Sequence, residues 1–291
     1  MTPPKIAVLG SVNLDFVIRT ARLPVAGETV SEGHFFTTPG GKGGNQALAA
    51  RKLGADVTLY ASVGDDPYAD AALENLKAEG VDVSQRLIQT EAKTGAAFIN
   101  VADDGENQIA VASGANALYT PDLAPKIDAD WIIAQLEINP ETILKAAEQS
   151  GAKLCINAAP VKPLPEALLA KTDLLIVNEI EHGYYAEALA AHQGLVALTL
   201  GSKGAVLLEN GTEIAKSPAP TVGVVDTTGA GDCFVAALTV FFAEGQTPSQ
   251  ALNAACICGA LATTQLGAQA GTPSRDAVER MMQDVEHASS D

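Results

Sequence analysis

Short apolar runs alternate with amphipathic segments along nearly the whole chain. The apolar runs predict buried strands at Ile6–Leu9, Val57–Ala61, Trp131–Gln135, Leu154–Asn157, Leu174–Val177 and Val196–Leu200. The segments between them predict helices, including Asn45–Leu53, Tyr68–Ala78, Glu141–Glu148, Asp232–Phe242 and Pro248–Thr264. Strands that alternate with helices build a mainly parallel sheet covered on both faces. We therefore expect an α/β fold with three layers, α/β/α, in a single domain of residues 1–291.

Two stretches break this alternation and predict strands with no helix between them. Leu14–Thr20 is followed by Glu28–Phe36, and Thr94–Val101 is followed by Asn107–Ala112. The turn-forming residues 102–106 between the second two strands favour a hairpin. We expect a small β-sheet lid, inserted into the main domain at about residues 12–37 and 88–113. Open strand edges favour pairing with a second copy, so a homodimer through the lid is also expected.

The chain is strongly acidic, and this excludes two classes of partner. Its 291 residues carry 18 Lys and Arg against 35 Asp and Glu, a net charge of −17. Nucleic-acid binding needs a basic groove, and peripheral membrane binding favours a basic helix. The longest apolar run, 233–243, is shorter than the roughly 20 residues that cross a bilayer. The first apolar stretch is also too short for a signal peptide.

The four cysteines match neither a zinc-finger nor a disulfide spacing. Cys256 and Cys258 are expected to pack inside a helix layer. A cytoplasmic protein fits this cysteine usage best. The polar tail from about Asp284 is expected to fray.

The strongest local motif is Asp226-Thr-Thr-Gly-Ala-Gly-Asp232, directly before an apolar helix. Glycines at a loop-to-helix junction let backbone N–H groups approach a ligand, and the helix N-terminus favours negative charge. The motif therefore predicts an anion site, most often one for phosphate, with Asp232 pointing at the bound group. The alternative is a purely structural helix cap, which uses the same residue types.

A second glycine-rich motif, Pro39-Gly-Gly-Lys-Gly-Gly-Asn-Gln46, also enters a predicted helix. It is not a Walker A loop, because Gly43 follows Lys42 where that motif has Ser or Thr. It is not a dinucleotide fingerprint either, because Gln46 stands where the third glycine belongs. Backbone donors, one cation and one amide remain, which suit hydroxyls or a phosphate. A plain glycine-rich turn is the alternative.

Further polar side chains follow the predicted strands. Gly10-Ser-Val-Asn-Leu-Asp15 follows the first strand, with Asn13 and Asp15 on one side, as a vicinal diol would require. Glu137, Asn178 and residues 199–204 follow later strands. Each alone is ordinary loop chemistry, but open α/β sheets bind ligands at this edge. The histidines have no partners at metal or triad spacing and are expected to face solvent; they are His34, His182, His192 and His287.

Taken together, these motifs resemble those of the ribokinase-like sugar kinases. The resemblance runs in order from about Lys5 to Pro273 and includes Gly64-Asp-Asp66 and Asn178-x-x-Glu181. The motifs around Gly41 and Asp232 are specific to that family. Several shorter motifs are most similar to the members that phosphorylate D-ribose; they are Gly105-Glu-Asn107, Ala112-Ser-Gly-Ala-Asn116, Gln135-Leu-Glu137 and Asn157-Ala-Ala-Pro160.

The resemblance implies ATP-dependent phosphorylation of D-ribose at O5, with Asp232 as the catalytic base. The anion hole would be Gly229, Ala230 and Gly231. The sugar would be held by Asn13, Asp15, Gly41, Lys42, Asn45, Glu137 and Asp232. The nucleotide side would comprise Asn178, Thr199, Leu200, Gly201, Ser202, Lys203, Gly204, Gly231 and Cys256. Cys256 departs from the family, whose members usually have Asn or His there.

Two metal ions follow from the same resemblance. Mg²⁺ would lie near Glu181. A monovalent cation, usually K⁺, would lie behind the anion hole and be bound by Asp226, Thr228, Ala262, Gln265, Gly267 and Gly271. Asp232, at a helix N-terminus, is expected to stay ionised without a raised pKa. The segment 178–199 is expected to have room for one helix.

Two other functions remain open. The same chemistry on another acceptor, such as a nucleoside, fructose or deoxyribose, is compatible with these motifs. A catalytically silent sugar- or nucleotide-binding regulator is the other, but it would be expected to have lost the base, and Asp232 is present.

Overall fold

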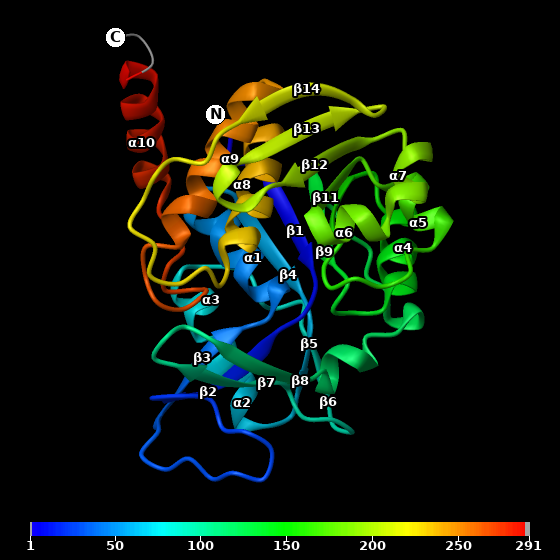
Figure 1. Cartoon of the computed structure of the whole chain (residues 1–291). Helices are drawn as coiled ribbons and strands as arrows, with labels where there is room; N and C mark the ends of the chain where they lie inside the picture. Colours follow the sequence, from blue (N-terminus) through cyan, green and yellow to red (C-terminus); the bar gives the residue numbers. More distant parts are fainter. Residues whose placement is uncertain (1, 289–291) are drawn as a thin grey trace.

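A central sheet of eight strands organises the main body of the molecule (Figure 1). The computed structural model describes residues 2–288. The strands are β1 (Lys5–Leu9), β4 (Asp56–Tyr60), β9 (Trp131–Gln135), β10 (Lys153–Asn157), β11 (Leu174–Asn178), β12 (Leu195–Thr199), β13 (Ala205–Glu209) and β14 (Thr212–Ser217). Their order is β14-β13-β12-β11-β10-β9-β1-β4, parallel from β12 to β4, with β13 and β14 antiparallel. The predicted, mainly parallel central sheet is therefore confirmed.

Helices cover both faces of this sheet. One face is covered by α1 (Lys42–Lys52), α8 (Ala230–Ala243) and α9 (Pro248–Ala262), with α10 (Arg275–Ala288) packed on α9. The other is covered by α4 (Pro140–Glu148), α5 (Glu166–Lys171), α6 (Glu179–Tyr184) and α7 (Ala186–Ala191). Within β1, Ile6 and Val8 join the first apolar core, whereas Ala7 joins the second. Because successive strand side chains point to opposite faces, each apolar strand serves both layers.

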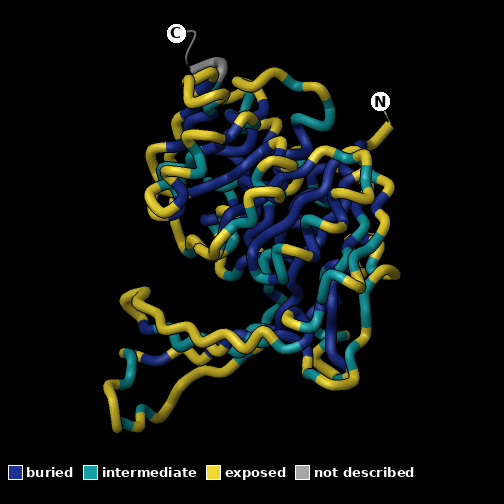
Figure 2. Tube along the Cα trace, turned by 90° about the vertical axis from the view of Figure 1, so that its right-hand side faces the viewer, coloured by how far each residue is buried: buried dark blue, intermediate teal, exposed yellow. Residues whose placement is uncertain are grey.

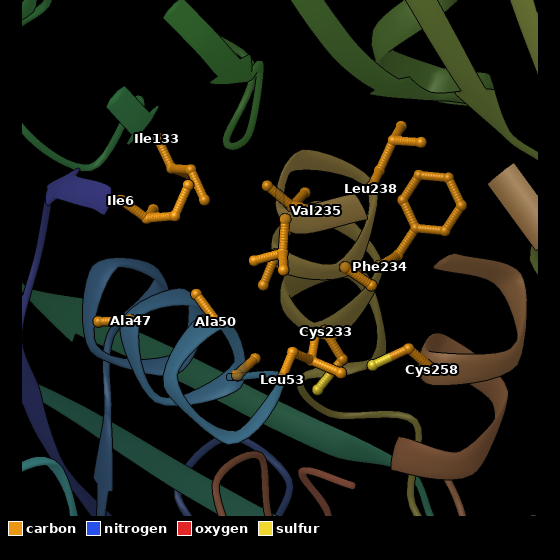
Figure 3. Close-up of a cluster of buried hydrophobic side chains, with 14 of the residues drawn as sticks. Ile6, Ala47, Ala50, Leu53, Ile133, Cys233, Phe234, Val235, Leu238 and Cys258 are labelled. Atoms are coloured by element: carbon orange, nitrogen blue, oxygen red, sulfur yellow. The ribbon is translucent and has the colours of Figure 1, made fainter. Parts of the chain in front are cut away.

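The core between α1, α8 and β1 is built from small and branched side chains (Figure 3). Ala50 of α1 lies on the side toward Val235 of α8, and Ile6 lies above Ala47. Small side chains let the helices approach closely. This close packing fixes the N-terminal turns of α1 and α8, which both carry predicted site residues.

The lid is a separate four-stranded sheet that projects from the main body and is largely exposed (Figure 2). Its strands are β2 (Asn13–Thr20), β3 (His34–Gly40), β7 (Gly95–Ala102) and β8 (Asn107–Ala112), in the order β3-β2-β7-β8. The strand predicted at Glu28–Phe36 is wrong at its start. Glu28 folds back on its own loop, where its carboxylate accepts the Val25 N–H at 3.1 Å and pairs with Arg22. The segment before His34 is therefore a loop.

Smaller elements support the base of the lid and differ in part from the predictions. They are β5 (Ser62–Gly64), β6 (Leu87–Gln89), α2 (Pro67–Ala72), α3 (Glu74–Ala78) and 3₁₀ turns at Gly114–Leu118, Pro121–Leu123 and Gly201–Lys203. The helix predicted over Tyr68–Ala78 is two helices, because the backbone departs from helical geometry at Leu73 (ψ 0°). The segment 178–199 likewise holds two short helices, α6 and α7, which meet at Tyr185 (ψ 11°). The prediction that this segment has room for only one helix was therefore wrong.

Two predictions about the surface are also corrected. His192 is buried at 6 % exposure rather than facing solvent, and burial lowers its pKa. Helix α10, which packs on α9, continues past Asp284 to Ala288, so the tail is helical up to that residue. Residues 289–291 and the side chain of His287 lie outside the described residues. Within residues 2–288, no helix has the length and apolar character needed to span a membrane.

Candidate active site

The site lies where the strand order of the central sheet reverses, at the carboxyl ends of β1 and β9. These adjacent parallel strands lead into residues 10–15 and 136–137. Ligands of open α/β sheets bind in the crevice at such a point. Gly10 and Gly43 pack so closely that a Cβ on Gly10 would lie 2.9 Å from the Gly43 Cα. Glycine at both positions lets the first loop and α1 meet backbone to backbone.

Ser11, Lys42 and Glu137 form a hydrogen-bonded floor below the lid. The Ser11 hydroxyl donates to Oε2 of Glu137, and the Lys42 N–H donates to the same oxygen at 3.1 Å. The Gly43 N–H lies 3.4 Å from the Ser11 Oγ, and the Gly44 N–H donates to the Ser11 carbonyl at 2.9 Å. The first turn of α1 is therefore tied to β1 and β9. The helix begins at Lys42 rather than at Asn45, so the glycine-rich motif is mostly a helical turn.

The base of the lid brings Asn13, Asp15 and Gly41 to this floor. Gly41 has φ 85°, and a Cβ there would lie 2.7 Å from the Asn13 nitrogen. Asp15 is largely buried, and its Oδ1 has no hydrogen-bond partner within the described chain. Burial, together with the negative charge of Glu137, raises the pKa of Asp15 to about 7. A largely buried acceptor without a partner in the described chain is suited to a sugar hydroxyl.

The Asp232 carboxylate lies opposite this floor, in the first turn of α8. Its Oδ2 accepts the Asn45 side-chain amide at 2.9 Å, and its Oδ1 accepts the Gln46 amide at 2.8 Å. The carboxylate is 6 % exposed. Burial raises its pKa, although Lys42, Asn45 and Gln46 favour the ionised form. The expectation of an unraised pKa was wrong, because the helix N-terminus does not offset the desolvation of this buried group.

A cavity of about 260 Å³ connects these groups to the start of α8. Among the residues lining it are Lys42, Asn157, Asn178, Glu181, Gly229, Gly231 and Asp232. Burial disfavours the charge on Lys42, but the carboxylates of Asp232, Glu137 and Glu181 outweigh it and raise its pKa. Gly229 caps α8 with φ 80°, and the first-turn N–H groups of Gly231 and Asp232 have no intrahelical acceptor. The cavity therefore combines a cation, a carboxylate and backbone donors.

Glu181 and Asn178 form a capping box at the start of α6. The Asn178 side chain accepts the Glu181 N–H at 2.8 Å, and the Glu181 carboxylate accepts the Asn178 N–H at 2.8 Å. Glu181 is buried, which raises its pKa. Within residues 2–288 no cluster of three or more His, Cys, Asp or Glu side chains forms a metal site. One carboxylate beside a phosphate pocket is nevertheless the usual protein share of a Mg²⁺ site.

A second cavity, of about 420 Å³, opens on the other side of the α8 N-terminus. Of the predicted nucleotide set, Thr199, Gly201, Ser202, Gly204, Gly231 and Cys256 line it, as do Ala230 and Phe234. Leu200 and Lys203 lie outside both linings, and Lys203 is exposed. The Cys256 thiol points to the Ser217 carbonyl at 3.7 Å, and burial raises its pKa to about 11. The lining is apolar and hydroxyl-bearing, as a planar base would require.

The predicted cation loop is assembled behind Gly229. The Asp226 carboxylate accepts the Thr228 N–H at 2.9 Å and the Gly267 N–H at 2.8 Å. These hydrogen bonds outweigh the effect of burial and lower the pKa of Asp226. A Cβ on Gly271 would lie 2.4 Å from the Ala262 carbonyl and 3.3 Å from that of Gly267. An ionised carboxylate beside converging carbonyls fits a monovalent cation; Gln265 is exposed in the same turn.

Several site residues were not assigned from the sequence. Asn116 holds Asn13, Ser11 holds Glu137, and Gln46 holds Asp232. Gln135 donates a hydrogen bond to Gln46, and Gln269 donates one to Asn45. Gln46 and Asn116 stand in motifs that the sequence does mark, whereas nothing in the local pattern distinguishes Gln269.

Comparison with known proteins agrees with this architecture. The family model for pfkB family carbohydrate kinases matches residues 3–275. The ribokinase of Bacillus subtilis is 38% identical over 291 residues, which cover 95% of this chain and 99% of the relative. The ribokinase structure from Thermotoga maritima has a TM-score of 0.86 at 30% identity, covering 96% and 99% of the two chains. The Arabidopsis thaliana ribokinase structure, complexed with ribose and ATP, has a TM-score of 0.83 at 29% identity, covering 96% and 98%. The chain thus belongs to the pfkB family of carbohydrate kinases.

Proposed function

We propose that the chain transfers the terminal phosphoryl group of ATP to O5 of D-ribose, forming D-ribose 5-phosphate. One observation carries the proposal: the Asp232 carboxylate stands in the cavity that joins the lid-covered floor to the α8 N-terminus. The names of the similar proteins support ribose and ATP as the substrates.

On the acceptor side, hydroxyls of the sugar would meet the polar groups at the base of the lid. Asn13 and Asp15 present an amide and a carboxylate from β2. Gly41, Lys42 and Asn45 present backbone and side-chain donors from the start of α1, and Glu137 presents its carboxylate from below. Paired donors and acceptors of this kind orient a polyol and exclude water from the reacting hydroxyl.

At the point of transfer, Asp232 would accept the proton of the attacking hydroxyl. Phosphoryl transfer passes through a loose transition state, so positioning and charge neutralisation dominate the catalysis. The N–H groups of residues 229–231 would donate to the oxygens of the migrating group. Lys42, next to three carboxylates, supplies a fixed positive charge in the same cavity.

On the donor side, the larger cavity would hold the nucleotide. Its apolar walls, including Phe234 and Cys256, suit the base. Thr199 borders both this cavity and the transfer cavity, and Asn178 borders the transfer cavity. Glu181 would hold Mg²⁺ together with the phosphate oxygens. Bound Mg²⁺ neutralises charge on those oxygens.

The loop formed by Asp226, Thr228, Ala262, Gln265, Gly267 and Gly271 would hold K⁺. A bound monovalent cation adds positive charge behind the anion hole. The ionised Asp226 and the converging backbone carbonyls support this assignment.

The lid favours a homodimer. Ile109 and Val111 of β8 are 57% and 59% exposed, and β8 is an open sheet edge. Exposed apolar strands with unpaired backbone groups favour association.

The four cysteines are free and buried, which agrees with a reducing, cytoplasmic location.

A coupled ADP-release assay tests the proposal. The purified protein is given ATP and a panel of ribose, deoxyribose, fructose and nucleosides, with and without K⁺. We expect ribose to give the highest kcat/KM and K⁺ to raise the rate. If another acceptor gives a higher kcat/KM, that acceptor and not ribose is the substrate. If no acceptor leads to ADP release, the chain is a binding protein without kinase activity.

A further inference from the structure

Five buried or half-buried amide side chains form an unbroken line on both sides of the Asp232 carboxylate. On one side, Gln46 donates to Oδ1 of Asp232 at 2.8 Å, and Gln135 donates to Oε1 of Gln46 at 2.6 Å. On the other, Asn45 donates to Oδ2 at 2.9 Å, Gln269 donates to Oδ1 of Asn45 at 3.3 Å, and Asn75 donates to Oε1 of Gln269 at 3.0 Å.

The carboxylate sets the orientation of every amide in this line. An ionised carboxylate only accepts hydrogen bonds, so Gln46 and Asn45 must turn their NH₂ groups toward it. Their oxygens then face outward and require donors, which Gln135 and Gln269 supply. A proton on Asp232 would remove its negative charge and part of its acceptor capacity, and so weaken both hydrogen bonds from the amides. The line as a whole therefore favours the ionised form.

Burial makes this orientation energetically significant. Gln46 and Gln135 are fully buried, and Gln269 is 2 % exposed. Water is excluded from these groups, so an amide that turned around would leave buried donors and acceptors unpaired. The outermost oxygen, Oε1 of Gln135, has no partner within the described chain and lies against Gly10, where a Cβ would come 2.0 Å from it.

We propose that this amide line positions the Asp232 carboxylate and holds it ionised, with Gln46 and Gln269 as positioning residues for the base. The inference rests on the proposed function, because it gives the line a role in proton transfer. The line also connects Asp232 to the loop of residues 267–271, which carries Gln269. Burial opposes the charge of Asp232, and the amide donors offset part of that effect.

The test replaces Gln46 by Met, which fills a similar volume but cannot donate a hydrogen bond. Protein labelled with ¹³C at the aspartate carboxyls is titrated by NMR, and the signal absent from Asp232→Asn identifies Asp232. We expect the titration midpoint of Asp232 to rise by about one pH unit in Gln46→Met, since one charge-assisted hydrogen bond is lost. The acid limb of the kcat profile should move with it, while KM for ATP stays unchanged.

The matched control is Thr239→Val. Thr239 is fully buried in α8, the helix that carries Asp232, and its hydroxyl donates to the Val235 carbonyl at 2.9 Å. This variant loses a buried hydrogen bond without touching Asp232. The titration midpoint of Asp232 and the acid limb of the kcat profile should therefore both stay unchanged. If Gln46→Met does not fold, Gln269→Met carries the test, with a smaller rise in the same direction.

An unchanged Asp232 midpoint in a folded Gln46→Met or Gln269→Met protein would overturn the inference. Failure of the proposed function gives a different result. If Asp232→Asn turns over normally, Asp232 is not the base, yet the NMR titration still decides whether the amides hold it ionised.

Discussion

The side-chain amide of Asn116 donates to Oδ1 of Asn13 at 2.9 Å, although 103 positions separate the two residues along the chain. The same Asn116 side chain accepts the Val12 N–H at 3.0 Å and donates to the Val12 carbonyl at 3.1 Å. It therefore pairs with the backbone as a neighbouring strand would. Gly95 leaves the room for this, since a Cβ there would lie 2.3 Å from the Asn116 nitrogen. One buried asparagine therefore ties the start of β2 to the 3₁₀ turn at Gly114–Leu118.

Replacing Asn116 by Ala should loosen this connection. The Val12 N–H would be left buried without a partner, which costs about 1–3 kcal/mol of unfolding free energy. Asn13 would lose its orientation, so we expect KM for ribose to rise about tenfold, the scale of one hydrogen bond, with little change in kcat. Steady-state kinetics and thermal unfolding measure both effects. Gln108→Ala, on the exposed strand β8, is the control, and an unchanged KM for ribose in Asn116→Ala would contradict the role.

Replacing Asp232 by Asn should remove the base while keeping the shape of the side chain. We expect kcat to fall about 10³-fold with a modest change in KM, because general-base catalysis contributes on this scale. Asp276→Asn is the control, since Asp276 is also a first-turn aspartate but lies exposed on α10. Turnover within about tenfold of the parent would contradict the base assignment.

The raised pKa of Asp15, about 7, predicts pH-dependent sugar binding. An ionised Asp15 accepts hydroxyl hydrogen bonds, so ribose affinity should fall as pH drops below 7, by about tenfold per pH unit at the limit. Calorimetry on Asp232→Asn measures this without the titration of Asp232. A flat affinity between pH 6 and 8 would contradict it.

Asp15 should also affect the free energy of unfolding, and the pH dependence of this effect should have the opposite sign to that of a salt-bridged carboxylate. The pKa of Asp15 rises from 3.8 to about 7 on folding, so the folded protein binds more protons than the unfolded chain in this window. The unfolding free energy therefore falls as pH rises through it. We expect Asp15→Asn to stabilise the fold at pH 8 by about 1–2 kcal/mol, after a discount for partial exposure, and not at pH 3. Equal stability of the two proteins at pH 8 would rule this out.

Replacing Asp226 by Asn should weaken activation by K⁺. The amide oxygen can still accept the Thr228 N–H, so the turn is kept, but the negative charge is lost. We expect the K⁺ concentration for half-maximal activation to rise about tenfold, measured by titrating K⁺ at saturating substrates. Asp65→Asn, a mostly exposed site at the base of the lid, is the control. An unchanged response to K⁺ would place the cation elsewhere.

A charge on the lid should separate the predicted dimer. Ile109→Lys places an ammonium group on an exposed apolar strand that is expected to be covered by a second copy. We expect light scattering to report about half the mass of the parent protein, because an unpaired charge is costly in a buried interface. Ile180→Lys, at a residue that is 78% exposed on α6 of the main body, should leave the mass unchanged. A parent protein that is already monomeric would refute the dimer.

The sequence predicted the six parallel strands of the central sheet and the helices α1, α4, α8 and α9, because each depends on local apolar periodicity. It did not name β13, β14, α5 or α10, and it began α1 at Asn45 rather than Lys42 and α8 at Asp232 rather than Ala230. It misplaced the start of β3, since the loop before His34 is closed by Arg22 and Glu28, a contact that periodicity does not reveal. It predicted Asp15, Glu137 and Asp232 at one edge of the sheet; in the structure they lie in β2, after β9 and at the start of α8, and their roles stay a prediction. It did not anticipate the raised pKa of Asp232, because desolvation depends on which residues surround the carboxylate in space.

Contacts between distant segments account for the other omissions. Asn116 stands in a motif that the sequence marks, but its contact with Asn13 joins segments 103 positions apart and appears only in the fold. Gln269 likewise reaches Asn45 only through the fold. His192 was expected to face solvent because it has no partner at metal or triad spacing, but the fold buries it beside Gly194, where a Cβ would lie 2.7 Å from the His192 Nε2.

The backbone contact between Gly10 and Gly43 limits how this scaffold can change its acceptor. No side chain fits at either position, so the lower wall of the crevice offers no room for redesign. The outer lid strand β8, by contrast, is exposed along its whole length. A mutant library that seeks a new acceptor therefore belongs in the exposed positions of the lid, while the glycines below it are kept.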